Sequence, residues 1–384
     1  MADATDRVRA NEARARTVRL PAGAESGAKD LTFLSFGEAG ARPKAYLQAG
    51  LHADELPGLL VLRNLGGELE RLAERGAIRG EIVLAPVANP IGLAQEHGGY
   101  LQGRLDRETG RNFNRGFPDL AAAIAEPLAA RLSDAPQANA EAARDEMRRF
   151  FEAVAPEKPV DVLQAALMAE ACDADIVLDL HADNEALVHL YTSEVSWPGA
   201  RDLAAEIDAR AVLIENESGG GPFDEAVGGV WRRLSERFPQ NPLPNASLSA
   251  TLELGSNNDV DPDTADRLAR ALVRFLMRRG SIDGEAGALP RLLCDATPLR
   301  AVQQVKAASE GLVVYRARLG DRVRTGDVVA EIVPPFGEVE TVEACTDGLL
   351  FARHDQRWAS PGKVIGKIAG SQLLPERTGD LLTD

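Results

Sequence analysis

The sequence is poor in cysteine and contains no long apolar run. Its three cysteines, Cys172, Cys294 and Cys345, lie far apart, which argues against a disulfide framework and favours a reducing, cytoplasmic compartment. Because no stretch of about eighteen apolar residues occurs, we expect no transmembrane helix. Residues 1–10 have no apolar centre, so they do not have the pattern of a signal peptide.

Basic residues are fewer than acidic residues in this chain. The chain has 43 Lys and Arg against 59 Asp and Glu, which gives a formal net charge of −16. This balance argues against a general nucleic-acid surface and against binding to anionic membranes. An anionic ligand would therefore need a local cluster of arginines. We expect a small molecule as the partner, with no nucleic acid and no membrane.

Strand-like and helix-like stretches alternate through most of the chain. The strand-like runs are apolar without polar alternation, which suits strands buried on both faces of a sheet. Helical patterns between them fit crossover connections. We therefore predict an α/β domain over residues 31–285, with a mixed, largely parallel sheet flanked by helices. The predicted strands are 44–49, 81–88, 175–180, 211–214 and 246–254, and the predicted helices are 56–72, 141–154, 160–172, 200–209 and 262–279.

A Gly-rich stretch, residues 281–290, marks a domain boundary. Short strands separated by Gly-Asp and Asp-Gly turns then predict a small all-β sandwich over residues 291–372. This part resembles the barrel-sandwich hybrid of lipoyl and biotinyl carrier domains. Those carriers present a lysine on a hairpin, but the matching span 334–344 has none, so we predict a structural or site-covering role. Residues 1–30 are expected to be an N-terminal extension and residues 373–384 a tail.

The segment Gly50–Gly58 carries two side chains with metal-binding chemistry, His52 and Glu55, between a predicted strand and a predicted helix. Such a turn places both at the end of a strand, where α/β proteins carry their chemistry. An imidazole and a carboxylate are two of the three protein ligands of a catalytic zinc site. A solvated pair near a helix start is the other interpretation of this short motif.

A third ligand should follow another strand. Of the five histidines, His181 alone ends a buried-looking strand and precedes a polar turn. Asp179 lies two positions earlier and points to the same face of that strand. It either orients the imidazole of His181 or is a capping or solvated residue. Two imidazoles and one carboxylate favour Zn²⁺ among the divalent ions.

Four motifs in this order resemble the succinylglutamate desuccinylase/aspartoacylase family of zinc carboxypeptidase-like deacylases. The motifs are G-x-H-x-x-E at 50–55, N-P-x-G at 89–92, x-x-L-N-R-x-F-P at 111–118 and the strand 251–254. In the third motif, Phe113 stands where the family usually has leucine. The resemblance implies a zinc-carboxypeptidase-like fold and a hydrolase acting on non-peptide amide bonds. It also implies one Zn²⁺ per subunit, held by His52, Glu55 and His181.

The resemblance assigns the proton transfer to Glu253, which is the only charged residue of the segment Ser247–Leu254. This carboxylate would take a proton from the zinc-activated water and pass it to the departing amine. Asn114 and Arg115 are the expected anchor for a substrate carboxylate, because a guanidinium offers a planar fork to two oxygens.

An arginine that stabilises the tetrahedral oxyanion is also expected. Arg107 is favoured, because its distance ahead of Asn114 resembles the aspartoacylase pattern. Arg111 is the reserve and a further substrate-binding candidate, and Arg104 is the weakest of the three. The alternative for Arg107 and Arg111 is a solvated loop charge.

We therefore predict a zinc-dependent amidohydrolase that removes the acyl group of a small N-acyl amino acid or related carboxylate metabolite. The alternatives are a zinc carboxypeptidase on the same scaffold and a non-catalytic binding module on a hydrolase fold. Residues 121–149 are Ala-rich and charged, which suggests either solvated helices or a homo-oligomer contact. The segment Gly219–Pro222 is expected to form a mobile lid or a hairpin, and its neighbours Phe223, Asp224 and Glu225 are candidates for the pocket lining.

Overall fold

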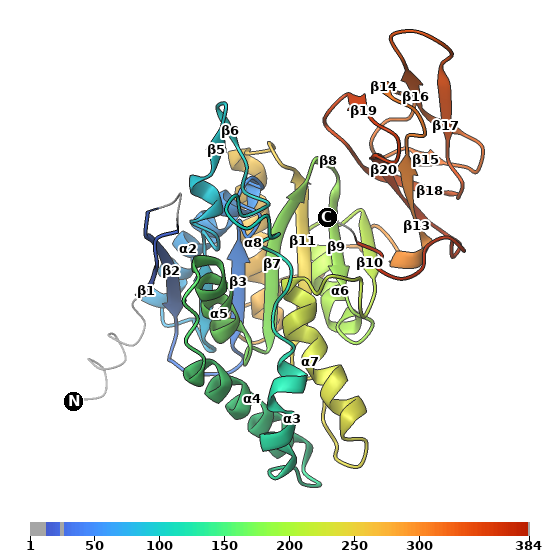
Figure 1. Ribbon diagram of the computed structural model, residues 1–384. Coiled ribbons are helices and arrows are strands. Elements are labelled where there is room, and N and C mark those ends of the chain that lie inside the picture. Colours follow the sequence, from blue (N-terminus) through green and yellow to red (C-terminus); the bar gives the residue numbers. More distant parts are fainter. Residues whose placement is uncertain (1–12, 24–26, 383–384) are drawn as a thin grey trace, which may run out of the picture.

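A nine-stranded sheet lies at the centre of the computed structural model, which describes residues 13–23 and 27–382 (Figure 1). Five of its eight neighbouring strand pairs are parallel and three are antiparallel. The predicted fold class, a mixed and largely parallel α/β sheet with helices, is confirmed. In spatial order the strands are β1 (Arg14–Leu20), β2 (Lys29–Phe36), β4 (Ile82–Ala85), β3 (Ala45–Ala49), β7 (Ile176–Asp183), β11 (Leu248–Ser256), β9 (Val188–Thr192), β10 (Ala211–Ile214) and β12 (Ala296–Pro298).

The two strands at one edge of the sheet include residues that the sequence assigned to an N-terminal extension. β1 pairs antiparallel with β2, and β2 pairs antiparallel with β4. Most of β1 is exposed, and three of its seven residues are arginines. An edge strand of this kind has no apolar run, which explains why the sequence pattern did not reveal it.

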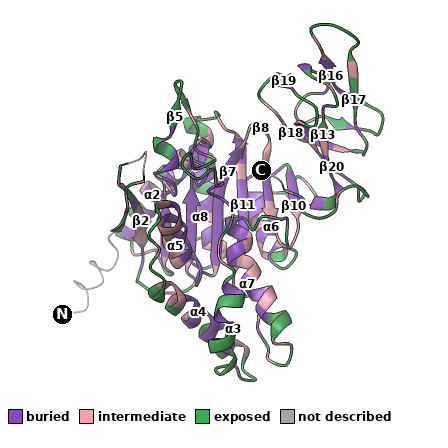
Figure 2. Ribbon diagram, in the orientation of Figure 1, coloured by how far each residue is buried: buried purple, intermediate pink, exposed green. Residues whose placement is uncertain are grey.

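Helices cover both faces of the sheet, and its central strands β4, β3 and β7 are almost entirely buried (Figure 2). Successive strand residues alternate between two cores: Tyr46 and Val177 face one, whereas Leu47 and Leu178 face the other. The first core is covered by α3 (Leu120–Ala129), α4 (Pro136–Ala153), α5 (Pro159–Ala171) and α7 (Phe223–Arg237), and the second by α2 (Pro57–Glu74), α6 (Trp197–Glu206) and α8 (Pro262–Arg278).

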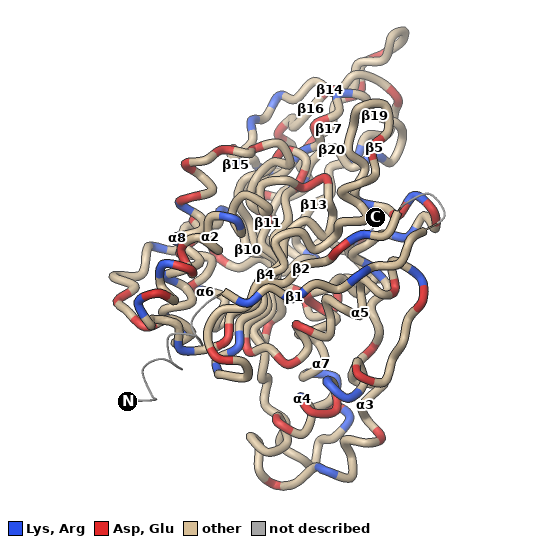
Figure 3. The backbone as a smooth tube through the Cα atoms, turned by 90° about the vertical axis from the view of Figure 1, so that its left-hand side faces the viewer, with Lys and Arg blue, Asp and Glu red and all other residues tan. Residues whose placement is uncertain are grey.

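The outer helices carry their charges on the solvent side. α8 buries Leu268, Leu272 and Phe275 but exposes Asp266 and Arg270, as an amphipathic surface helix does. Charges of both signs are interspersed along such helices (Figure 3). Within residues 13–23 and 27–382, no helix has the length and apolar character needed to cross a membrane.

The C-terminal residues form two antiparallel sheets, called here the β region. Their strand orders are β13-β20-β18-β15 and β17-β16-β14-β19, and β8 (Glu185–Ala186) of the α/β part pairs with β18. The β region therefore docks by pairing β18 with a strand of the α/β part. The strands of the β region are β13 (Val302–Lys306), β14 (Gly311–Tyr315), β15 (Arg322–Val323), β16 (Val328–Val333), β17 (Glu340–Glu343), β18 (Gly348–Arg353), β19 (Trp358–Ala359) and β20 (Val364–Gly370). The remaining short elements of the described chain are η1 (Gly92–Ala94), β5 (Glu96–His97), β6 (Tyr100–Leu101) and η2 (Leu299–Ala301).

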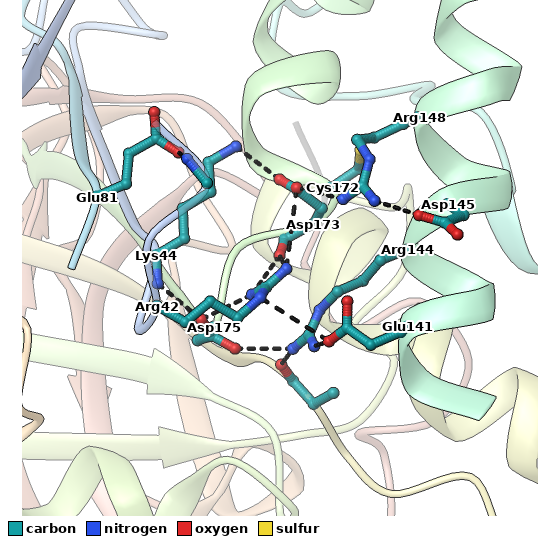
Figure 4. A network of polar contacts seen from close by, with 12 residues as sticks. Arg42, Lys44, Glu81, Glu141, Arg144, Asp145, Arg148, Cys172, Asp173 and Asp175 are labelled. Carbon is teal, nitrogen blue, oxygen red and sulfur yellow. Dashed lines mark hydrogen bonds and ion pairs between the residues drawn. The ribbon is translucent and has the colours of Figure 1, made fainter. Parts of the chain in front are cut away.

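A polar network fixes the amino ends of the central strands (Figure 4). Asp175, just before β7, accepts hydrogen bonds from the side chains of Arg42 and Arg144 and from the backbone N–H of Lys44, each at 2.7 Å. Arg144, on α4, also donates to the carbonyl of Ala246 at 2.9 Å. The starts of β3, β7 and the segment leading into β11 are thereby tied to one helix. These are the strands whose other ends carry the candidate site.

Candidate metal centre

A sharp turn after β3 presents His52 and Glu55 above the sheet. Gly50 has a φ of +69°, in the left-handed region that favours glycine. Gly58 lies in the first turn of α2, where a Cβ would lie 3.0 Å from the Cβ of Ala49 and 3.2 Å from that of Leu180. The missing side chain lets α2 begin directly against β3 and β7. The Gly50–Gly58 motif thus combines a turn with a close helix start.

The three predicted ligands meet in one buried cluster. Glu55 Oε1 lies 2.9 Å from His52 Nδ1, and Glu55 Oε2 lies 2.7 Å from His181 Nδ1. The backbone N–H of Ala182 also donates to Oε2, at 3.0 Å. Across the described part of the chain, this is the one group of three or more His, Cys, Asp or Glu residues that could hold a metal ion, with ligand atoms within 4.8 Å of one another.

Each imidazole is oriented by a partner on its other nitrogen. His52 Nε2 lies 2.9 Å from Asn112 Oδ1, and His181 Nε2 lies 3.0 Å from Asp179 Oδ2. Gln48 Nε2 in turn donates to Asp179 Oδ1 at 3.0 Å. A proton on each Nε2 would leave the two Nδ1 atoms available to bind a metal ion. This is how proteins orient metal-binding histidines.

Strand register places Glu253 beside the cluster. On the parallel strands β7 and β11, Glu253 is opposite His181 and Thr251 is opposite Asp179. On the other side of β11, His189 of β9 is opposite Glu253. Directly opposite residues share a face of the sheet, so these side chains form two polar rows across an otherwise apolar sheet. The predicted base therefore lies on the strand next to a predicted ligand.

The cluster is electrostatically coupled. Burial alone would raise the pKa of Glu55, but the two imidazoles hold it well below its usual range. Burial alone would lower the pKa of His181, but the carboxylates of Asp179 and Glu55 raise it well above its usual value. Burial, followed by the charge of Glu55, raises the pKa of Glu253 to about 8. Glu253 Oε2 is buried without a hydrogen-bond partner among the described residues.

The three candidate arginines lie in different surroundings. Arg104 Nη1 lies 3.3 Å from Glu55 Oε1, at the cluster. Arg107 donates to a backbone carbonyl of β5 at 2.7 Å, and Arg111 forms an ion pair with Asp161 at 2.5 Å. The structure therefore brings Arg104, the weakest sequence candidate, closest to the ligands. The roles of Arg107 and Arg111 remain predictions.

Asn114 and Arg115 lie together at the edge of the same site. Asn114 Oδ1 accepts a hydrogen bond from the backbone N–H of Phe223 at 2.8 Å, and its Nδ2 lies 3.5 Å from His181 Nε2. Arg115 Nη1 donates to the carbonyl of Asn114 at 2.8 Å. Both side chains line the cavity described next, where a substrate carboxylate could reach them.

A cavity of about 500 Å³ opens onto the cluster. Asp224 and Glu225, at the start of α7, line it as the sequence suggested, whereas Phe223 is fully buried in the hydrophobic core. Burial is the main cause that raises the pKa of Asp224 to about 6 and that of Glu225 to about 8. The cavity wall thus contains carboxylates that release their protons near neutrality.

The β region supplies part of the cavity wall. The sequence predicted a structural or site-covering role for it, but no motif indicated which of its residues would line the cavity. Arg353, His354 and Lys367 come from β18, the loop after it and β20. Lys367 Nζ lies 2.5 Å from Asp183 Oδ2 and forms a nearly buried ion pair across the two parts. The sequence around Lys367 could not predict this contact, because Asp183 is far away along the chain.

The residues of the cluster fit a divalent metal ion. Two Nδ1 atoms and one carboxylate converge, and the distal nitrogen of each imidazole is already held. The buried carboxylates of Glu55 and Asp179 contact the two imidazoles, so negative charge lies beside them. A bound cation would neutralise this charge, and the donor set is that of a zinc site with an open position.

Fold and site together define a class of protein: an α/β protein with a buried His–Glu–His cluster at the carboxyl ends of parallel strands. The sequence profile of the succinylglutamate desuccinylase/aspartoacylase catalytic domain matches residues 41–279. The chain belongs to this family, and the resemblance inferred from the sequence motifs is confirmed.

Similar proteins extend the comparison to the whole chain. The N-alpha-acetyl-L-2,4-diaminobutyric acid deacetylase of Halomonas elongata is 24% identical over 336 residues, which are 86% of this chain and 83% of the relative. A crystal structure of a family member from Shewanella frigidimarina is 26% identical with a TM-score of 0.81, covering 94% of this chain and 98% of that one. The ectoine utilization protein EutE (DoeB) of Ruegeria pomeroyi shares the fold, with a TM-score of 0.65, 17% identity and coverage of 94% and 96%. The family and relative names indicate a hydrolase acting on amide bonds.

Proposed function

We propose that this chain is a zinc-dependent deacylase that hydrolyses the amide bond of a small N-acyl amino acid or related carboxylate metabolite. The observation that carries the proposal is the convergence of two imidazole Nδ1 atoms on the Glu55 carboxylate, beside Glu253 on the neighbouring strand. Family membership supports amide hydrolysis. His52, Glu55 and His181 would hold one Zn²⁺ per subunit.

The side chains suit this chemistry. A zinc ion at the cluster would supply a Lewis acid that polarises the acyl carbonyl and lowers the pKa of a water molecule. Glu253 would take a proton from the attacking water and return it to the departing amine nitrogen. Its place on the strand next to His181 suits both steps. Arg104 would stabilise the negative charge on the acyl oxygen, with Arg107 as the alternative.

The surroundings of the site favour a small substrate. Asn114 and Arg115 would anchor its carboxylate, since a guanidinium and an amide together offer several donors. We assign residues 31–285 to the hydrolase domain and residues 291–372 to the β region, although β1 and β12 add residues from outside 31–285 to the sheet of the hydrolase domain. The β region narrows the cavity and so disfavours a polypeptide. The Halomonas elongata relative is a deacetylase of an N-acetylated amino acid, which makes an acetyl group the first to test. We place the protein in the cytoplasm.

A panel of N-acyl amino acids with acetyl, succinyl and longer acyl groups tests the proposal. Purified protein is expected to hold one zinc per chain and to hydrolyse at least one member. Chelation should abolish the activity and added zinc should restore it. Glu253→Gln should lower kcat by about 10²- to 10⁴-fold, because proton transfer is lost while the zinc ligands remain.

Zinc content and melting temperature of Glu253→Gln serve as the controls, and both should match the wild type. Equal rates for the variant and the wild type would rule out the proton-transfer role. Release of C-terminal residues from peptides, without activity on N-acyl amino acids, would instead favour the carboxypeptidase. Absence of both zinc and hydrolysis would favour a binding module.

A further inference from the structure

The C-terminal tail returns from the β region to the catalytic part and reaches the cavity (Figure 1). The backbone N–H groups of Leu381 and Leu382 both donate to the carbonyl of Ser218, at 2.7 and 3.0 Å. Leu381 is 1% exposed and packs in an apolar cluster with Leu213 and Leu299. Leu382 itself lines the cavity. The described end of the chain is therefore part of the cavity wall.

The contacted segment, residues 215–222, is called here the glycine loop. Gly219 has a φ of +103°, and a Cβ at this position would lie 2.6 Å from the Cβ of Asp380 in the tail. Gly220 has a φ of +70°, and a Cβ there would lie 2.6 Å from Cδ of Arg115. The loop joins β10 to α7 and is packed between the tail and the predicted anchor arginine. Neither glycine has room for a side chain.

Ser218 connects the tail to α7 through this loop. Its N–H donates to Glu225 Oε1 at 2.8 Å, while its carbonyl accepts the two bonds from the tail. Arg377 Nη2 donates to the carbonyl of Leu381 at 2.8 Å, so the tail is also held to itself. The loop is thereby fixed from α7 and from the tail, and its remaining side supports Arg115.

We propose that residues 380–382 are a substrate-positioning element that holds the glycine loop against Arg115. The proposal rests on the proposed function, in which Arg115 anchors the substrate carboxylate. An arginine side chain has many rotamers, and a packed support removes that freedom before the substrate arrives. Release of the tail would let Arg115 adopt other rotamers. Glu253 on β11, His181 on β7 and the turn that carries His52 and Glu55 do not include the glycine loop, so these residues would keep their geometry.

Leu381→Asp in the full-length, zinc-loaded protein tests this proposal, because a carboxylate placed in an apolar cluster should undock the tail. KM for the N-acyl amino acids is expected to rise about tenfold while kcat stays within about threefold, the pattern of lost substrate binding. In substrate-free protein, the backbone amides of residues 218–222 should exchange with deuterium faster. Leu373→Asp, in the same tail but 65% exposed, is the matched control and should behave as wild type.

A chain ending at Gly379 removes the same contacts without burying a charge, and it replaces Leu381→Asp if that variant does not fold. Wild-type KM or wild-type exchange in the folded variant would overturn the proposal. If the wild type hydrolyses no member of the panel, the proposed function fails. In that case, faster deuterium exchange of the glycine loop in Leu381→Asp would still show that the tail holds the loop. Unchanged exchange would overturn this role of the tail.

Discussion

At the scale of single residues, we expect metal binding by the His–Glu–His cluster to depend on the charge of Asp179. This carboxylate is fully buried, lies 3.0 Å from His181 Nε2 and accepts a hydrogen bond from Gln48. Tyr46 donates to Gln48 Oε1 at 2.8 Å, so a chain of polar groups runs from the core to the imidazole. A carboxylate in this position fixes the tautomer of the histidine and raises its basicity as a ligand.

Asp179→Asn should therefore weaken zinc binding by about 10- to 100-fold, because the neutral amide no longer favours a proton on His181 Nε2. Competition with a zinc chelator would measure the change in Kd. Gln48→Leu leaves the carboxylate charged and is expected to cost less affinity. An unchanged Kd in Asp179→Asn, with the fold intact by circular dichroism, would contradict this role.

At the scale of elements, strands with continuous apolar runs were predictable and the others were not. β10 has the predicted bounds, β3 begins one residue later than predicted, and β7 ends three residues later, because burial on both faces demands apolar residues throughout. The strands β1, β2, β9 and β12 of the sheet and the helix α7 were missed. β1 is exposed along most of its length, and α7 follows a run of three glycines and contains two more, so neither has the pattern that reveals a core element.

The candidate site divides in the same way. His52, Glu55, His181 and Glu253 all follow or end strands that pair in parallel, so topology alone brings them together. The arginines lie in the long connection between β6 and α3, which has no periodic pattern. Its path is set by tertiary contacts such as the Arg111–Asp161 ion pair. The sequence therefore could not indicate which arginine reaches the cluster.

Substitution of these arginines tests whether Arg107, which the sequence favoured, or Arg104, which lies at the cluster, stabilises the oxyanion. Arg104→Met is expected to lower kcat/KM by about 10²-fold, because the guanidinium 3.3 Å from Glu55 is positioned to stabilise an oxyanion. Arg107→Met, whose partner is a backbone carbonyl, should change kcat/KM by less than about threefold. Steady-state kinetics on the most active N-acyl substrate would decide. The reverse order of effects would restore Arg107 as the oxyanion residue.

At the scale of the whole molecule, the β region is bound to the catalytic part close to the metal cluster. β18 pairs with β8, and Glu185 of β8 accepts hydrogen bonds from Arg353 and Arg357, at 2.6 and 2.5 Å. Lys367 reaches Asp183, two residues beyond His181. The sequence predicted the β strands but not this docking, because a two-residue strand and a long-range ion pair have no local pattern.

Loss of the interdomain ion pair tests how far the two parts are one folding unit. Lys367→Met leaves the Asp183 carboxylate, with 12% of its side chain exposed, without its cation. Such a change should lower the free energy of unfolding by about 3 kcal/mol in denaturant titration. Lys306→Met, at an exposed position of β13, should have almost no effect. Adding Asp183→Asn to Lys367→Met should recover most of the loss, because no buried charge then remains. If the β region unfolded in a separate transition and only that transition lost stability, its docking would contribute little to the stability of the nine-stranded sheet.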